Sequence, residues 1–133
     1  MRRVFLIGLL ALSSCSSASD LAAVTKAIDA FHSELNAGNF DQVYADSAPD
    51  WKQSTAKAQT VQLFTSLKGK LGNFISATQT GWHVNYGTGG TMVTVVDDSK
   101  FQKAKGTEVF TYRVSGSTAQ LVGYNINSPA LLG

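Results

Sequence analysis

The sequence predicts an α+β domain in which three N-terminal helices pack on a curved, four-stranded antiparallel sheet. Two observations lead to this class. Apolar residues recur at helical spacings of three and four up to about residue 71, and beyond it they alternate as in β-strands. The composition, 44% hydrophobic and 15% charged, is that of a globular protein with a folded core. Helices followed by a run of strands are typical of helices packed on one face of a sheet, and 133 residues suffice for one domain.

The first helix is predicted to begin at Ser19 or Asp20, either of which can cap it, and to end at Gly38. A second, short helix contains Phe40 to Tyr44 and ends before Pro49, because the residue before a proline disfavours the helical region. Trp51 is expected just past that break. The first helix presents one apolar face, made of Leu21, Val24, Ile28, Phe31 and Leu35.

A third helix is predicted from Thr55 to Leu71, with Gly72 as its terminator. Four strands follow, and glycine-rich segments separate them. We expect an interruption of the first strand around Gly81 and a turn at Lys105-Gly106. The strands are predicted at residues 74–86, 91–96 with a continuation to 103, 108–114 and 121–126.

The first fourteen residues are typical of a signal peptide. Arg2 and Arg3 precede an apolar stretch from Val4 to Leu12, which as a helix would be only about 13 Å long, against ~30 Å for a bilayer core. The segment Leu12-Ser13-Ser14-Cys15 resembles the lipobox of bacterial lipoproteins, whose cysteine receives diacylglycerol before cleavage on its amino side. The resemblance implies lipidation of Cys15, a leader at 1–14 and a lipidated tether at 15–19.

Two other interpretations of this segment remain open: an ordinary secretory peptide near a stray cysteine, and a short hydrophobic helix. A serine after the cysteine resembles lipoproteins sent to the outer membrane. We therefore expect a location in the bacterial cell envelope, on the periplasmic side of the outer membrane and attached to it through the lipid. Cys15 is the only cysteine, so an intramolecular disulfide is excluded.

The charge of the chain argues against a nucleic-acid partner. The chain has 11 Lys and Arg against 9 Asp and Glu, and Arg2 and Arg3 belong to the predicted leader. Without these two the domain is neutral, and its charges are interspersed. Nucleic-acid binders instead carry a basic patch or stripe.

The order of elements resembles the NTF2-like, cystatin-like cone fold. The resemblance rests on the Gly38-Asn39-Phe40-Asp41 connection between the first two helices and on the ends of the next two helices, before Trp51 and at Leu71-Gly72. It also rests on the last strand, Leu121 to Ile126. In particular the chain is similar to small bacterial lipoproteins of this fold classed as domains of unknown function. The similarity covers 20–128 and leaves 129–133 as a tail. Because this fold hosts isomerases, dehydratases, transport factors and dimerisation modules, it implies no function.

Asp/His pairs deep in the cone serve enzymes of that superfamily as acid and base. This chain has two histidines, and His32 flanks the apolar face of the first helix, while Asp50 follows Pro49, where the family's second helix turns toward the cone mouth. His32 could equally be a hydrogen-bonded residue at the rim, and the aromatic residues could be core. No residue is assigned as catalytic. The expected pocket residues are His32, Tyr44, Asp50, Trp51, Tyr86, Tyr112 and Tyr124.

The spacing of carboxylates and histidines predicts no metal site, and no motif indicates a cofactor. His32 and Glu34 are two residues apart, so they project from different sides of a helix. Three functions are compatible with these features, in order of preference. The first is a non-catalytic binding or interaction module with an envelope protein as partner, or a homodimer. The second is a carrier of a small apolar ligand in the cone, and the third is a small enzyme that uses His32 with a carboxylate.

Overall fold

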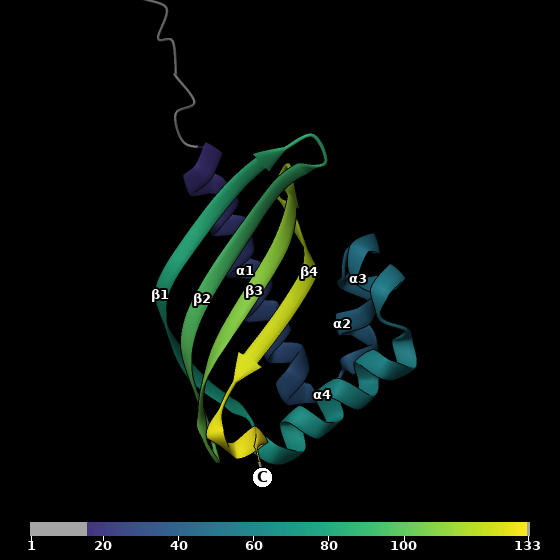
Figure 1. Ribbon diagram of the computed structural model, residues 1–133, viewed down its shortest axis with the longest axis vertical. Helices are drawn as coiled ribbons and strands as arrows, with labels where there is room; N and C mark the ends of the chain where they lie inside the picture. The colour runs from purple at the N-terminus through teal and green to yellow at the C-terminus, as the bar shows by residue number, and fades with distance from the viewer. Residues whose placement is uncertain (1–15, 133) are drawn as a thin grey trace, which may run out of the picture.

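The structure is a computed structural model that describes residues 16–132, so Cys15 and the predicted leader lie outside the described residues. Helices come first and a sheet follows, which confirms the predicted α+β class (Figure 1). The helices are α1 (Ser16–Ala37), α2 (Phe40–Asp46), α3 (Pro49–Ser54) and α4 (Lys57–Leu71). The strands are β1 (Phe74–Gly87), β2 (Gly90–Phe101), β3 (Lys105–Ser115) and β4 (Thr118–Asn127), and a short 3-10 turn, η1 (Pro129–Leu131), comes after them.

The four strands form one antiparallel sheet in the order β1-β2-β3-β4. The sheet curves, and α1 lies along its concave face while α2, α3 and α4 extend that layer beyond β4 (Figure 1). The register shifts between Gln79 and Gly81 in β1, and again opposite Thr111 and Tyr112 of β3, where β4 carries the extra residue Val122. Such bulges bend and twist a strand, and the first confirms the predicted interruption at Gly81.

The helical half contains more elements than the sequence predicted. α1 begins at Ser16, so the cap predicted at Ser19 or Asp20 is wrong, and the described part of the expected tether is helical. α3 was not predicted, and Trp51 lies within it rather than past a break. Pro49 occupies the first turn of α3, where its fixed φ favours a helix and its missing N–H has no intrahelical acceptor to lose.

The turn predicted at Lys105-Gly106 is also wrong, because both residues belong to β3. The chain reverses instead at residues 102–104, where the Phe101 N–H donates to the Ala104 carbonyl oxygen at 2.8 Å. A Cβ on Gly106 would lie 3.2 Å from the carbonyl oxygen of Asn127. Gly106 therefore allows β3 and the end of β4 to approach closely. The residues around it in the sequence do not distinguish this role from that of a glycine in a turn.

Aromatic side chains dominate the core between α1, α4 and the sheet. The Phe31 ring contacts Phe64 and Phe110 edge-on, at centroid separations of 5.4 and 5.3 Å. As predicted, the apolar face of α1 points into this core, and Phe110, Tyr112 and Val114 share the inner face of β3. The predicted periodicities thus identify the buried faces of both layers.

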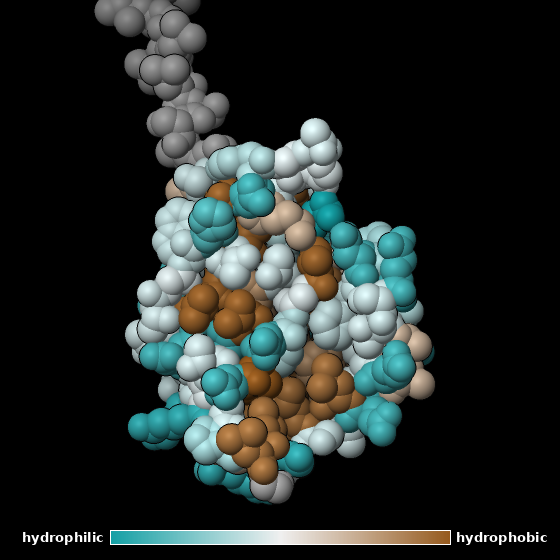
Figure 2. Space-filling model, viewed as in Figure 1, coloured by the Kyte–Doolittle hydropathy of each residue, from teal (hydrophilic) through white to brown (hydrophobic). Residues whose placement is uncertain are grey.

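The surface carries an apolar area where β4 faces α4, in the lower half of Figure 2. Leu63 and Leu132 are exposed, and Leu63, Ile126 and Leu131 border a shallow groove of about 250 Å³. Across residues 16–132, no helix has the length and hydrophobicity needed to cross a membrane.

Candidate functional site

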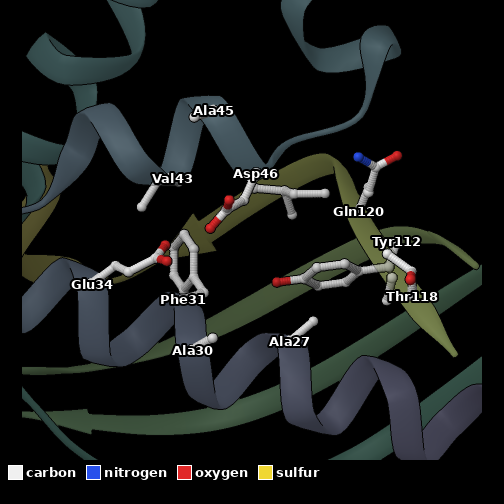
Figure 3. A pocket seen from close by; sticks show the side chains of 12 residues that line it. Ala27, Ala30, Phe31, Glu34, Val43, Ala45, Asp46, Tyr112, Thr118 and Gln120 are labelled. Carbon is white, nitrogen blue, oxygen red and sulfur yellow. The ribbon is translucent and has the colours of Figure 1, made fainter.

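A pocket of about 310 Å³ lies between α1, α2 and the start of β4 (Figure 3), and we call it the Tyr112 pocket. Its volume is at the lower end of the range for small-molecule sites, roughly 300–1,000 Å³. Small side chains help to create the space, since Ala27 and Ala30 line it from α1. The residues that line it are Ala27, Ala30, Phe31, Glu34, Val43, Ala45, Asp46, Tyr112, Thr118, Ala119, Gln120 and Leu121.

The hydroxyl of Tyr112 points into this pocket (Figure 3). Tyr112 is only 2% exposed, and its hydroxyl has no hydrogen-bond partner among the residues that the structure describes. Burial, followed by the negative charges of Glu108 and Glu34, raises the pKa of Tyr112, so the phenol stays neutral and can donate. Among the described residues no fully buried side-chain oxygen or nitrogen lacks a partner, so the Tyr112 hydroxyl oxygen is accessible from the pocket, where a polar atom of a ligand could accept its hydrogen bond.

Two carboxyl groups face one another at the side of the same pocket, Glu34 from α1 and Asp46 from α2 (Figure 3). Burial, a hydrogen bond to Asp46 and the nearby like charge together raise the pKa of Glu34 to about 7. Asp46 Oδ1 in turn accepts a hydrogen bond from Gln42 Nε2 at 2.7 Å. Below about pH 7 Glu34 is therefore mostly protonated and can donate this proton to Asp46.

A second polar group lies deeper, around Glu108 on β3, whose side chain is fully buried. Its Oε1 accepts hydrogen bonds from Ser99 Oγ at 2.5 Å and His32 Nε2 at 2.8 Å, and its Oε2 accepts one from the Tyr124 hydroxyl at 2.7 Å. Three donors replace the water that a buried carboxylate loses. We call these four residues the Glu108 network.

His32 connects the Glu108 network to a groove of about 400 Å³ between α1, β1 and β2. The imidazole is 4% exposed and stacks on Phe74 with a centroid separation of 3.5 Å. Asp97 also lines this groove, and its pKa is raised by burial and, next, by the charge of Glu108. Among residues 16–132, His32 makes its only hydrogen bond through Nε2, so Nδ1 has no protein partner.

The structure distributes the predicted pocket residues over several places. His32 and Tyr124 meet at Glu108, whereas Tyr112 lines the other pocket. His32 is buried, so its interpretation as a rim residue is wrong. Trp51 belongs to the core and donates from Nε1 to Thr60 Oγ1 at 3.0 Å.

Three of the predicted residues lie away from both groups. Asp50 forms an ion pair with Arg113, at 2.8 Å between Oδ2 and Nη2, and this hydrogen bond lowers the pKa of Asp50. It is therefore not the partner of His32. Tyr44 is half-buried beside Lys52, and Tyr86, one residue before the end of β1, is 59% exposed.

The sequence interpretation missed Glu34, Asp46, Ser99 and Glu108. Glu108 opens the alternation that continues through Phe110 and Tyr112, so its position on the inner face could have been read from the strand pattern. Glu34 follows Phe31 by three residues and Ala27 by seven, which places all of them on one side of α1. Asp46 has no such signal, because its approach to Glu34 depends on how α2 packs against α1.

The described residues contain no cluster of three His, Cys, Asp or Glu side chains that could hold a metal ion. No protein-family model matches the chain, and no curated protein matches its sequence. Its function is therefore inferred from the geometry of the Tyr112 pocket and the Glu108 network.

Proposed function

We propose that the chain is a lipid-anchored protein of the bacterial envelope, and that its domain binds a small, largely apolar molecule in the Tyr112 pocket without catalysing a reaction on it. The observation that carries this proposal is Tyr112, a buried residue whose hydroxyl opens into the pocket and has no partner among the described residues. The apolar walls supply the contact area, and the few polar groups supply orientation, as in most small-molecule sites.

The position of the pocket suits an anchored protein. Cys15 directly precedes α1, and Ala27 comes eleven residues after Ser16, which corresponds to about 16 Å of helix. A lipid on Cys15 would hold the pocket near the bilayer, where apolar molecules partition. Two or three acyl chains suffice for stable attachment, since each buried methylene contributes about 0.8 kcal/mol.

Filling the pocket tests the binding proposal. We expect Ala27→Phe to abolish binding of small naphthyl probes, measured by calorimetry, because the new ring occupies the space between α1 and β4. Ala22→Phe, on the exposed side of the same helix, is the matched control and should bind as the wild type does. Ala30→Leu is a milder second filling variant, and melting curves show that each variant folds. If no probe binds the wild type, or Ala27→Phe binds them equally well, the proposal is wrong.

The anchor has a separate test. Cys15→Ser should abolish labelling of the chain by a radioactive fatty acid and leave unprocessed or soluble protein. Unchanged labelling would contradict lipidation at Cys15, although the binding proposal would stand.

One observation favours a second candidate function, a small enzyme that uses His32 as a general base. Glu108 fixes Nε2, and the same ring lines a groove together with Asp97. This is the arrangement in which a carboxylate orients a histidine and leaves its other nitrogen to accept a proton. Nitrogen NMR of labelled His32 tests it, because a ring that carries protons on both nitrogens throughout pH 5 to 8 cannot act as a base.

A further inference from the structure

We infer that the ligand of the Tyr112 pocket is a cationic amphiphile: an organic amine whose ammonium group binds between Glu34 and Asp46 and whose apolar body lies over Phe31 and the alanines. This inference rests on the proposed function, because it names the chemistry of the molecule that the same pocket binds. Three features of the pocket carry it: the acidic charge of its lining, the two carboxyls that face one another, and the Tyr112 hydroxyl that has no described partner.

The charged residues that line the pocket are both acidic, and none of the lining residues is basic. The ammonium of Lys52, on α3, is engaged elsewhere, since it donates to the Ala45 carbonyl oxygen at 2.9 Å and lies 5.6 Å from the centre of the Tyr44 ring. An anionic head group, such as a fatty acid carboxylate, would therefore meet two carboxyls and no counter-charge. A cationic head group would meet complementary charge.

The groups that face Glu34 come from two elements: Asp46 from α2 and the neutral Tyr112 hydroxyl from β3, while β4 contributes only uncharged side chains to the pocket. The two carboxyls face one another across the pocket, so an ammonium between them would relieve their repulsion, as protonation of Glu34 does at lower pH. The N–H groups of the ammonium would then form charge-assisted hydrogen bonds to both carboxylates, which are about twice as strong as neutral ones.

The remainder of the pocket excludes simpler occupants. A metal ion would find only two carboxyls and a phenol, and its hydration shell would face apolar walls formed by Phe31, Val43 and Leu121. A neutral apolar molecule would fill the walls but leave the acid pair and the Tyr112 hydroxyl without new partners. An amine with an apolar body satisfies all of these groups at once.

Three probes of one shape test this chemistry: 2-(1-naphthyl)ethylamine, 2-(1-naphthyl)ethanol and 1-naphthylacetate. Their binding to the full chain in zwitterionic nanodiscs is measured by calorimetry at pH 8, with empty nanodiscs as the blank. We expect the amine to bind at least about tenfold more tightly than the alcohol, as a hydrogen bond to a charged group predicts, and the carboxylate to bind most weakly. Equal affinities for the amine and the alcohol would overturn the inference and leave the binding proposal intact.

Matched variants test which residues cause the preference for the amine. Glu34→Gln should lower the affinity for the amine to that for the alcohol and leave the affinity for the alcohol unchanged. Tyr112→Phe should weaken the binding of both probes by about fivefold.

The pH dependence of the binding enthalpy is a second measurement. At pH 6 the amine should displace the Glu34 proton, so the binding enthalpy should depend on the ionisation enthalpy of the buffer, and at pH 8 this dependence should vanish. A preference for the amine that persists in both Glu34→Gln and Asp46→Asn would overturn the inference. Tight binding of the amine that survives Ala27→Phe would overturn the proposed function as well.

Discussion

Glu108 and Glu34 are both acids on the inner side of their elements, but Glu108 is fully buried and Glu34 is only half-buried. Glu108 is fully buried and accepts hydrogen bonds from three donors, so its charge is compensated within the protein. Glu34 faces another acid, Asp46, and the Tyr112 hydroxyl in the same pocket has no partner among the described residues. The first arrangement is complete within the protein, whereas the second leaves polar groups open to the pocket. This difference is why we assign structure to the Glu108 network and binding to the Tyr112 pocket.

The largest expected effect comes from the same substitution made at both acids. Glu108→Gln removes a carboxylate that three donors require and places an amide N–H₂ among them, so it should lower the free energy of unfolding by about 3 kcal/mol. Glu34→Gln keeps a donor toward Asp46 and removes a charge, so it should leave stability at pH 8 unchanged or raised. Chemical denaturation measures both. Equal losses would show that the two acids have the same structural role.

Removing one hydroxyl from each group should give a smaller contrast. Tyr124→Phe deletes a hydrogen bond to a charged acceptor and should lower the free energy of unfolding by about 1.5–3 kcal/mol. Tyr112→Phe deletes a hydroxyl that has no described partner, so the free energy of unfolding in the absence of ligand should be unchanged or slightly higher. A loss at Tyr112 as large as that at Tyr124 would mean that the protein already satisfies this hydroxyl.

The smallest expected effect is the pH dependence that Glu34 confers, because Glu34 is only half-buried and Asp46 is exposed, so solvent screens their interaction. Its pKa is raised from 4.5 to about 7 in the folded chain, so the folded state binds this proton more tightly than the unfolded state. The stabilisation is fully present below about pH 4.5 and is lost as the pH rises through about 7. The melting temperature of the wild type relative to Glu34→Gln should therefore fall by a few degrees between pH 5 and pH 8. A constant difference would show that Glu34 titrates normally.

The fold was predictable because each layer repeats one pattern. The apolar spacing from Leu21 to Leu35 and the alternation from Phe110 to Val114 identify their buried faces without knowledge of any partner. α3 was missed because a proline ends one helix and starts another in the same short segment.

The candidate site was less predictable, since it depends on contacts between elements. His32 was identified as a pocket residue, but its hydrogen-bond partner Glu108 was not identified, because it lies 76 positions away in the sequence. Tyr112 was expected at a pocket, whereas the pairing of Glu34 with Asp46 results from the close approach of α1 and α2. The anchor at Cys15 stays a prediction of the sequence alone.

The most direct test of ligand binding in the Tyr112 pocket is to locate a bound probe by NMR. With 2-(1-naphthyl)ethylamine at saturation, we expect nuclear Overhauser contacts from the naphthyl protons to the ring of Tyr112 and the methyl groups of Ala27 and Ala30, and none to the ring of Tyr124 or His32. Contacts to Tyr124 or His32 in place of Tyr112, or no contacts to the protein, would contradict the assignment of the Tyr112 pocket as the binding site.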